Sequence, residues 1–143
     1  MLAAGPARRQ YHLPRKGVPP RWTRGTYSGY SPPTVMAQFS DDVLWHQPGA
    51  NQFSGDHHGI GGVGALLGGM MDASAGSFEL VVAGPAMVNG EAVAVPVRFT
   101  GNRADATMDM AGIDLLTVRD GKIVEVRLFS EDGHGEDLFW GLK

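Results

Sequence analysis

Three side chains that can carry protons near neutral pH lie in or beside apolar runs of the sequence: His46, Asp114 and Asp132. A histidine titrates at about pH 6.5 and therefore suits the work of a general base. A carboxyl group among apolar neighbours has its charged form disfavoured, so it can hold or donate a proton near neutrality. We expect acid–base chemistry in which His46 is a base or proton shuttle. Asp114 would stabilise an enolate or relay the proton, and Asp132 would be an auxiliary acid or base.

Each of these residues also has a structural interpretation. His46 could be a core histidine that donates to a neighbouring strand, and Asp114 could be a strand residue that bonds to nearby backbone or to His46. Asp132 could cap the helical turn at Glu136 or end a strand in solvent. The residue types alone leave both interpretations open at all three positions.

Other polar motifs favour neither a metal nor a cofactor. His57 and His58 are adjacent and cannot easily converge on one ion, and no further ligand follows at a useful spacing. Residues 59–64 spell GxGxxG, but a polar loop stands where dinucleotide binding needs a strand. The chain has no cysteine, which excludes thiolate metal sites and cysteine nucleophiles. Acid–base groups in an apolar cavity suffice for enolisation without a cofactor.

The element that must position Asp114 is a predicted hairpin over residues 106–132, which turns at Asp120 and Gly121. Alternation places five residues of its first arm on one face: Met108, Met110, Gly112, Asp114 and Leu116. The second arm places five on one face and three on the other: Val124, Val126, Leu128, Ser130 and Asp132, against Glu125, Arg127 and Glu131. An apolar face that carries carboxylates at Asp114 and Asp132 indicates a pocket.

The other predicted elements surround this hairpin. Periodicity and turn signals give a helix end at 33–39, a short strand at 43–46, a loop and helix at 51–71, strands at 78–83 and 91–100, and a helical turn at 136–140. In the short strand, Leu44 and His46 share one face, while Val43 and Trp45 share the other. This order predicts an α+β fold, a curved antiparallel β-sheet folded over one or two helices.

Charge divides the chain into two parts. Residues 1–40 contain six basic and no acidic residues, which leaves the remaining six basic and all 15 acidic residues to the rest. Residues 1–33 are rich in proline and glycine, and we interpret them as an extended or disordered basic arm before a domain at 34–143. Arginine interleaved with aromatic residues could contact nucleic acid, but a solvated tail is favoured. With no long apolar run, we expect no membrane partner and a cytoplasmic location.

The order of these elements, with five short segments, resembles the SnoaL-like branch of the nuclear-transport-factor-2-like superfamily. The segments are FSDDVLWHQPG at 39–49, FSGDHHG at 53–59, DMAGID at 109–114, VRDGKIVE at 118–125, and SED at 130–132 followed by DLFW at 137–140. The resemblance covers roughly residues 34–143. It implies a cone with an apolar cavity, a cystatin-like α+β barrel, usually as a homodimer. It covers ketosteroid isomerases and polyketide cyclases as well as non-enzymatic binding domains.

The resemblance also implies roles for particular positions. Asp114 falls where ketosteroid isomerases keep a protonated Asp, and their general base aligns with Gln47 or His46. The cyclases' catalytic Asp lies beside Glu131 and Asp132. The pattern of limonene epoxide hydrolase is disfavoured, because Leu44 and His46 replace its Tyr and Asn and no Arg is in register. Eight residues are expected to line the substrate cavity: Leu44, Trp45, Phe53, Met110, Gly112, Val126, Leu128 and Ser130.

Two functions remain open. The first is an isomerase- or cyclase-type enzyme without a metal, acting on a hydrophobic carbonyl substrate. The second is a non-catalytic small-molecule-binding or dimerisation module of the same fold. Gln47 at the position of the base favours the second, because an amide does not usefully accept a proton, and residues 1–33 do not resemble the family's first helix.

Overall fold

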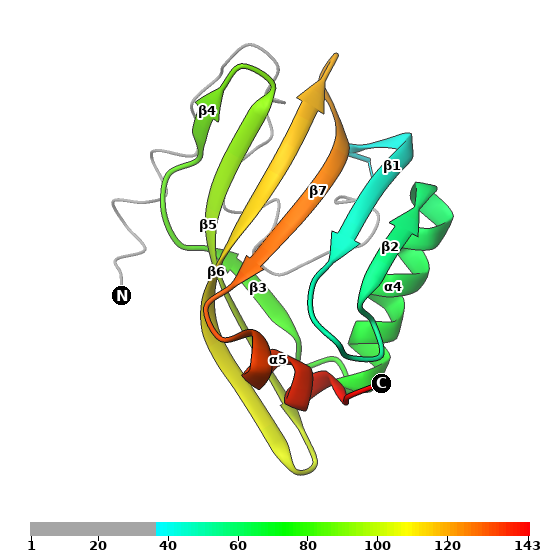
Figure 1. The fold of residues 1–143 in the computed structure, drawn as a ribbon, viewed down its shortest axis with the longest axis vertical. Coiled ribbons are helices and arrows are strands. Elements are labelled where there is room, and N and C mark those ends of the chain that lie inside the picture. Colours follow the sequence, from blue (N-terminus) through cyan, green and yellow to red (C-terminus); the bar gives the residue numbers. More distant parts are fainter. Residues whose placement is uncertain (1–36) are drawn as a thin grey trace.

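The computed structural model describes residues 37–143, which form one curved sheet with two helices (Figure 1). The proposed arm at 1–33 lies outside the described residues. The elements in chain order are β1 (Phe39–Gln47), β2 (Gly55–His58), α4 (Gly59–Ala73), β3 (Glu79–Val82), β4 (Met87–Asn89), β5 (Ala92–Arg103), β6 (Ala106–Arg119), β7 (Lys122–Ser130) and α5 (Gly133–Trp140). The strand order across the sheet is β2-β1-β7-β6-β5-β3, with β4 also paired to β5.

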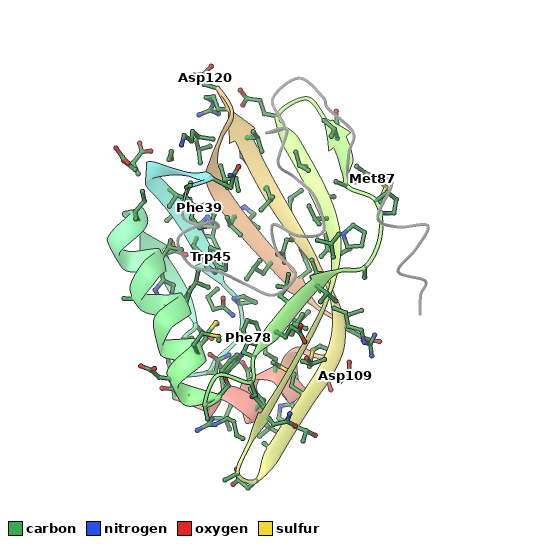
Figure 2. All side chains as sticks on the ribbon, turned by 180° about the vertical axis from the view of Figure 1, so that it is seen from behind. Phe39, Trp45, Phe78, Met87, Asp109 and Asp120 are labelled. Atoms are coloured by element: carbon green, nitrogen blue, oxygen red, sulfur yellow. The ribbon has the colours of Figure 1, made fainter. Side chains whose placement is uncertain are left out.

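Strands β5, β6 and β7 are the centre of the sheet. Strand β6 pairs antiparallel with β5 along twelve residues and with β7 on its other edge. The expected turn is confirmed, since Asp120 and Gly121 both have positive φ, at 52° and 77°. One pair departs from the antiparallel pattern: β1 runs parallel to β7. Strand β1 is also the strand against which α4 packs (Figure 2).

A β-bulge corrects one detail of the predicted register. Val118 pairs with Ile123, but Thr117 pairs with Glu125, so Val124 is an extra residue in β7. Ile123 is therefore 1% exposed and belongs to the core, while Val124 is only partly buried. Beyond the bulge the predicted alternation holds.

The first elements differ from expectation. The predicted helix end at 33–39 is wrong where the structure describes it, because Ala37 and Gln38 form a turn and Phe39 begins β1. Phe39 is 2% exposed and packs edge-on against Trp45, which holds the longer strand against the core. Strand β2 was not predicted, since GDHH has no strand pattern. Pairing with the free edge of β1 gives it its conformation.

The two helices pack on the inner face of the sheet. Helix α4 buries Val63, Leu66, Leu67 and Met70 despite its glycines, which confirms the predicted helix. Helix α5 begins three residues earlier than expected. Phe139 lies over Gly101 of β5, where a side-chain Cβ would stand 2.9 Å from its ring. Gly101 thus lets α5 approach the sheet closely. Neither helix reaches the length of about 20 residues that a membrane crossing needs.

Candidate functional site

A cavity lies between the inner face of the sheet, α4 and α5. Most of its wall is aromatic or aliphatic, with four polar side chains. The residues that line it are Trp45, Gln47, Leu67, Met70, Met71, Phe78, Leu80, Phe99, Asp114, Leu128, Phe129, Ser130 and Glu136. Figure 2 shows Trp45 and Phe78 on the α4 side of the sheet. A cavity therefore lies on the inner face of the sheet, and its use as a ligand-binding pocket stays a prediction.

Asp114 stands on this cavity wall in the middle of β6. It pairs with Val95 of β5 on one side and with Leu128 of β7 on the other, and only 4% of it is exposed. Its neighbours along the same face of β6, Leu116 and Met110, are buried. A carboxyl group is thus built into the apolar wall by strand alternation, as the sequence predicts.

Glu136 brings a second carboxyl group to the cavity from the first turn of α5. It is 6% exposed, and the hydroxyl of Ser130 donates to its Oε1 at 2.5 Å. Burial is the main cause that raises the pKa of Glu136 above its ordinary value, and the negative charge of Asp137 raises it further. The Ser130 hydroxyl and the Trp140 indole N–H act in the opposite direction and lower this pKa. The Trp140 indole N–H faces Glu136 closely enough to lower this pKa, but it does not reach the distance and angle of a full hydrogen bond with any group of residues 37–143. The protonated form of Glu136 is therefore favoured more than in water.

Gln47 connects Glu136 to the aromatic wall. The Trp45 indole N–H donates to Gln47 Oε1 at 3.0 Å, which turns the amide so that Nε2 faces Glu136 Oε2 at 3.4 Å. Gln47 is 5% exposed. It fills the position where the resemblance places a general base, but its amide acts here as an orienting group.

His46 lies on the opposite face of the sheet. Its neighbours Trp45 and Gln47 face inward, so alternation turns His46 outward. The expectation that His46 shares a cavity with Asp114 is therefore wrong. Its Nδ1 lies 2.7 Å from Asp56 Oδ1, and its Nε2 lies 2.7 Å from a carboxylate oxygen of Glu125.

These two carboxylates set the proton affinity of His46. The hydrogen bond to Glu125 is the main cause that raises its pKa, and Asp56 adds to it, while burial and the charge of Arg127 lower it. Arg127 also bonds to Glu125 at 3.2 Å. His46, Asp56, Glu125 and Arg127 form what we call the outer cluster, a mutually paired group on β1, β2 and β7.

Asp132 caps a helix, which is one of the two structural roles that the sequence allowed for it. Its side chain accepts from the backbone N–H of Gly135 at 2.9 Å, which makes it the N-cap of α5. It is exposed and lies outside the cavity lining. Its expected acid–base role has no support from this position, although its cap helps to hold the helix that carries Glu136.

Comparison with known proteins identifies the family. The model of the SnoaL-like domain matches residues 21–126, about three-quarters of the chain. The chain belongs to the SnoaL-like family. The match begins thirteen residues before the boundary that we expected at residue 34.

Solved structures agree with this assignment. A protein of unknown function with a cystatin-like fold from Xanthomonas campestris is 46% identical, with 82% of this chain and 92% of that chain covered and a TM-score of 0.78. An NTF2-like protein of unknown function from Burkholderia pseudomallei is 18% identical, with coverage of 76% and 84% and a TM-score of 0.67. A putative polyketide cyclase from Bacillus cereus is also 18% identical, with coverage of 82% and 71% and a TM-score of 0.58.

The latter two show the fold alone. The search of curated proteins finds no match. The expected α+β fold and the SnoaL-like resemblance are confirmed.

The SnoaL-like cavity contains part of the predicted lining. Trp45, Leu128 and Ser130 are in its wall. Leu44 faces outward beside His46, so its predicted place in the lining is wrong for the same reason of alternation. Phe53 packs instead on Trp140, with ring centroids 5.2 Å apart.

Three more predicted lining residues support the wall from behind. Met110 and Val126 are core residues, 6% and 0% exposed, and do not line the cavity. Gly112 makes room for Phe99, because a Cβ at this position would lie 2.7 Å from the Phe99 ring. The absence of a side chain at Gly112 thus allows Phe99 to reach the cavity.

Glu136 is the main residue that the sequence interpretation missed. One signal was present: Glu136 precedes Trp140 by four residues, so both lie on the same face of a helix. A charged residue on a buried helical face is unusual enough to mark a candidate site. Within residues 37–143, no group of three metal-ligating side chains is placed to hold an ion. The expectation of no metal or cofactor stays a prediction.

Proposed function

We propose that this SnoaL-like protein is an acid–base enzyme of the isomerase or cyclase type, acting on a small apolar substrate that contains a carbonyl group. The observation that carries the proposal is a buried carboxyl group, Asp114, in the wall of a mainly apolar cavity. Buried titratable groups in clefts mark candidate catalytic sites. The family resemblance and the polyketide cyclase neighbour are consistent with this class.

The reaction follows from the chemistry of a carbonyl compound in such a cavity. Asp114 takes a proton from the carbon next to the carbonyl, and the resulting enolate is returned to a ketone when the proton is delivered to another carbon. The apolar walls exclude water and hold the hydrophobic body of the substrate. Atoms and electrons balance without a co-reactant. His46 has no part in this step, because it lies on the other face of the sheet.

The experiment is exchange of the enolisable protons of 2-tetralone for deuterium in heavy water, followed by NMR. We expect the wild-type protein to accelerate exchange above buffer and Asp114→Asn to lower the acceleration by at least about 100-fold, the usual contribution of a general base. His46→Gln is the matched control and should keep the wild-type rate. Equal rates for the wild type and Asp114→Asn would contradict the proposal.

The second candidate function is a non-catalytic binding module. The observation that favours it is Gln47, which occupies the place of a base with an amide already bonded to Trp45. In that case 2-tetralone raises the melting temperature of the protein by mass action, while exchange stays at the buffer rate.

The homodimer suggested by the resemblance also has a surface that fits it. Pro96, Ile113 and Phe129 are cross-strand neighbours on β5, β6 and β7. Ile113 and Phe129 are 37% and 54% exposed, and Phe129 also contributes atoms to the cavity lining. A second copy could bury this row against its own. Ile113→Lys should then convert a dimer to a monomer in sedimentation, while Val88→Lys, on the exposed strand β4, should not.

A further inference from the structure

The cavity between the sheet, α4 and α5 contains two buried carboxyl groups. Asp114 of β6 and Glu136 of α5 both line it, and they are 4% and 6% exposed. No Lys, Arg or His is among the described residues of its wall. Arg103 donates to the carbonyl oxygen of Phe139 on α5, and neither of these two residues lines the cavity. The described wall therefore carries acidic groups without a basic group on the same wall.

Three polar side chains turn donor groups toward Glu136. The Ser130 hydroxyl of β7 donates to Oε1 at 2.5 Å, and the Gln47 amide of β1 donates to Oε2 at 3.4 Å. The Trp140 indole N–H faces the same carboxyl group. Such donors stabilise a carboxylate, whereas burial without a counter-ion destabilises it. A positive charge is the partner that the described wall does not supply.

The rest of the wall suits a cation that carries apolar groups. Trp45, Phe78 and Phe99 bring aromatic rings to the lining, and Trp45 is held in place by its hydrogen bond to Gln47. Aromatic rings attract ammonium ions, most strongly where water is excluded. A primary ammonium ion has three N–H donors that a mainly apolar wall cannot all satisfy. An ammonium ion with three or four alkyl groups has one N–H or none, so it fits this wall better.

We propose that this cavity binds a small ammonium ion with three or four alkyl groups, its charge beside the two carboxyl groups and its alkyl groups against the aromatic rings. This ligand class goes beyond the carbonyl substrate of the proposed function and does not depend on that function. Both ligands would occupy one cavity, so the cation competes with the ketone for it. The cation is recognised by its charge and the ketone by its apolar body.

Binding of the cation is coupled to the loss of a proton from Glu136. Burial raises the pKa of Glu136, and the charge of Asp137 on the same helix raises it further. The other elements of the wall contribute Asp114 from β6 and the uncharged Gln47 and Ser130 from β1 and β7, while the lining residues of α4 and β5 are apolar. A cation beside Glu136 lowers its pKa. The affinity for the cation therefore rises as pH rises through the titration of Glu136.

The test measures binding of choline and of 3,3-dimethylbutan-1-ol, in which carbon replaces the charged nitrogen, by NMR titration across pH. At a pH above the titration of Glu136, we expect the wild-type protein to bind choline at least about 10-fold more tightly than the alcohol. The affinity for choline should fall in acid, and that for the alcohol should not. Ethanolamine, which keeps the charge without the methyl groups, should bind more weakly than choline.

Two variants remove the charge of each carboxyl group and keep the shape of the side chain. Glu136→Gln and Asp114→Asn should each lower the affinity for choline by at least about 10-fold and leave that for the alcohol nearly unchanged. Glu136→Gln should also abolish the rise of choline affinity with pH. Glu79→Gln is the matched control, because Glu79 is exposed on β3 and outside the lining. It should bind choline as the wild type does.

Equal affinities of the wild-type protein for choline and the alcohol would overturn the proposal, and this comparison does not require any variant to fold. A choline affinity that neither Glu136→Gln nor Asp114→Asn changes would overturn it as well. The proposed function has a separate outcome. Deuterium exchange of 2-tetralone that depends on Asp114 retains the enzyme whether or not choline binds, and choline bound in the cavity should slow that exchange.

Discussion

The two faces of the sheet handle charge in opposite ways. On the inner face, Glu136 has a raised pKa because burial destabilises its charged form. On the outer face, His46 also has a raised pKa, because hydrogen bonds to Glu125 and Asp56 stabilise its charged form. The pKa of Glu136 is raised because its charged form is unfavourable, whereas the pKa of His46 is raised because its charged form is favourable. A raised pKa therefore indicates a reactive group only when its cause is known.

The same difference separates the face that holds the candidate active site from the face whose charged groups contribute to stability. The outer cluster pairs each charged group with an opposite one, near solvent, and such arrangements contribute modestly to stability. On the inner face, burial raises the pKa of Glu136, and the described cavity wall contains no Lys, Arg or His that would favour its charged form. Natural proteins keep such costs mainly where function requires them. The inner face is where the candidate activity belongs.

The largest expected effect is on the free energy of unfolding, and it compares two adjacent leucines of β6 that face opposite sides of the sheet. Leu116 faces inward and is fully buried, whereas Leu115 faces outward and is partly exposed. Leu116→Ala should lower the free energy of unfolding by about 3 kcal/mol through the lost transfer energy and the cavity left behind. Leu115→Ala should cost no more than about 1 kcal/mol. Urea denaturation at a fixed oligomeric state measures both, and equal losses would contradict the assignment of faces.

The next effect is the pH dependence that Glu136 gives to stability. Because its folded pKa lies above the unfolded value, its protonated form stabilises the native state at low pH, and this contribution is lost as pH rises through the folded pKa. Glu136→Gln removes the titration. The variant should match the wild type in acid and become the more stable protein as pH rises. The measurement is the urea midpoint of the wild type and of Glu136→Gln at several pH values. The two midpoints would change in parallel with pH if Glu136 were not buried in the folded protein.

The smallest effect concerns the outer cluster. The folded pKa of His46 is also raised, so its stabilisation is complete below the unfolded value of about 6.5 and is lost as pH rises through the folded pKa. His46→Gln should therefore be less stable than the wild type in acid, by less than about 1 kcal/mol, and equal to it at alkaline pH. Added salt should shrink the difference at His46 more than that at Glu136. A deficit that persists at alkaline pH would point to packing instead of charge.

The hairpin that carries Asp114 could be predicted because its information is local. Asp120 and Gly121 specify the turn, and apolar alternation specifies the face of Asp114, so strand pairing and the buried carboxyl group followed from a short stretch of chain. The same rule failed at His46 for a different reason. Alternation correctly separated Leu44 and His46 from Val43 and Trp45, but it could not say which pair faces the core. Packing of Trp45 on Phe39 and α4 decided that.

The sequence by itself determined the hairpin, the α4 helix, the carboxyl group at Asp114 and the resemblance to the SnoaL-like family. Only the tertiary structure decided which face of β1 lines the cavity, that GDHH becomes strand β2, and that α5 brings Glu136 against Ser130 and Gln47. The physical reason is range. Turn preference and alternation act between neighbours, whereas the burial of Glu136 depends on contacts between residues 89 positions apart, as from Gln47 to Glu136.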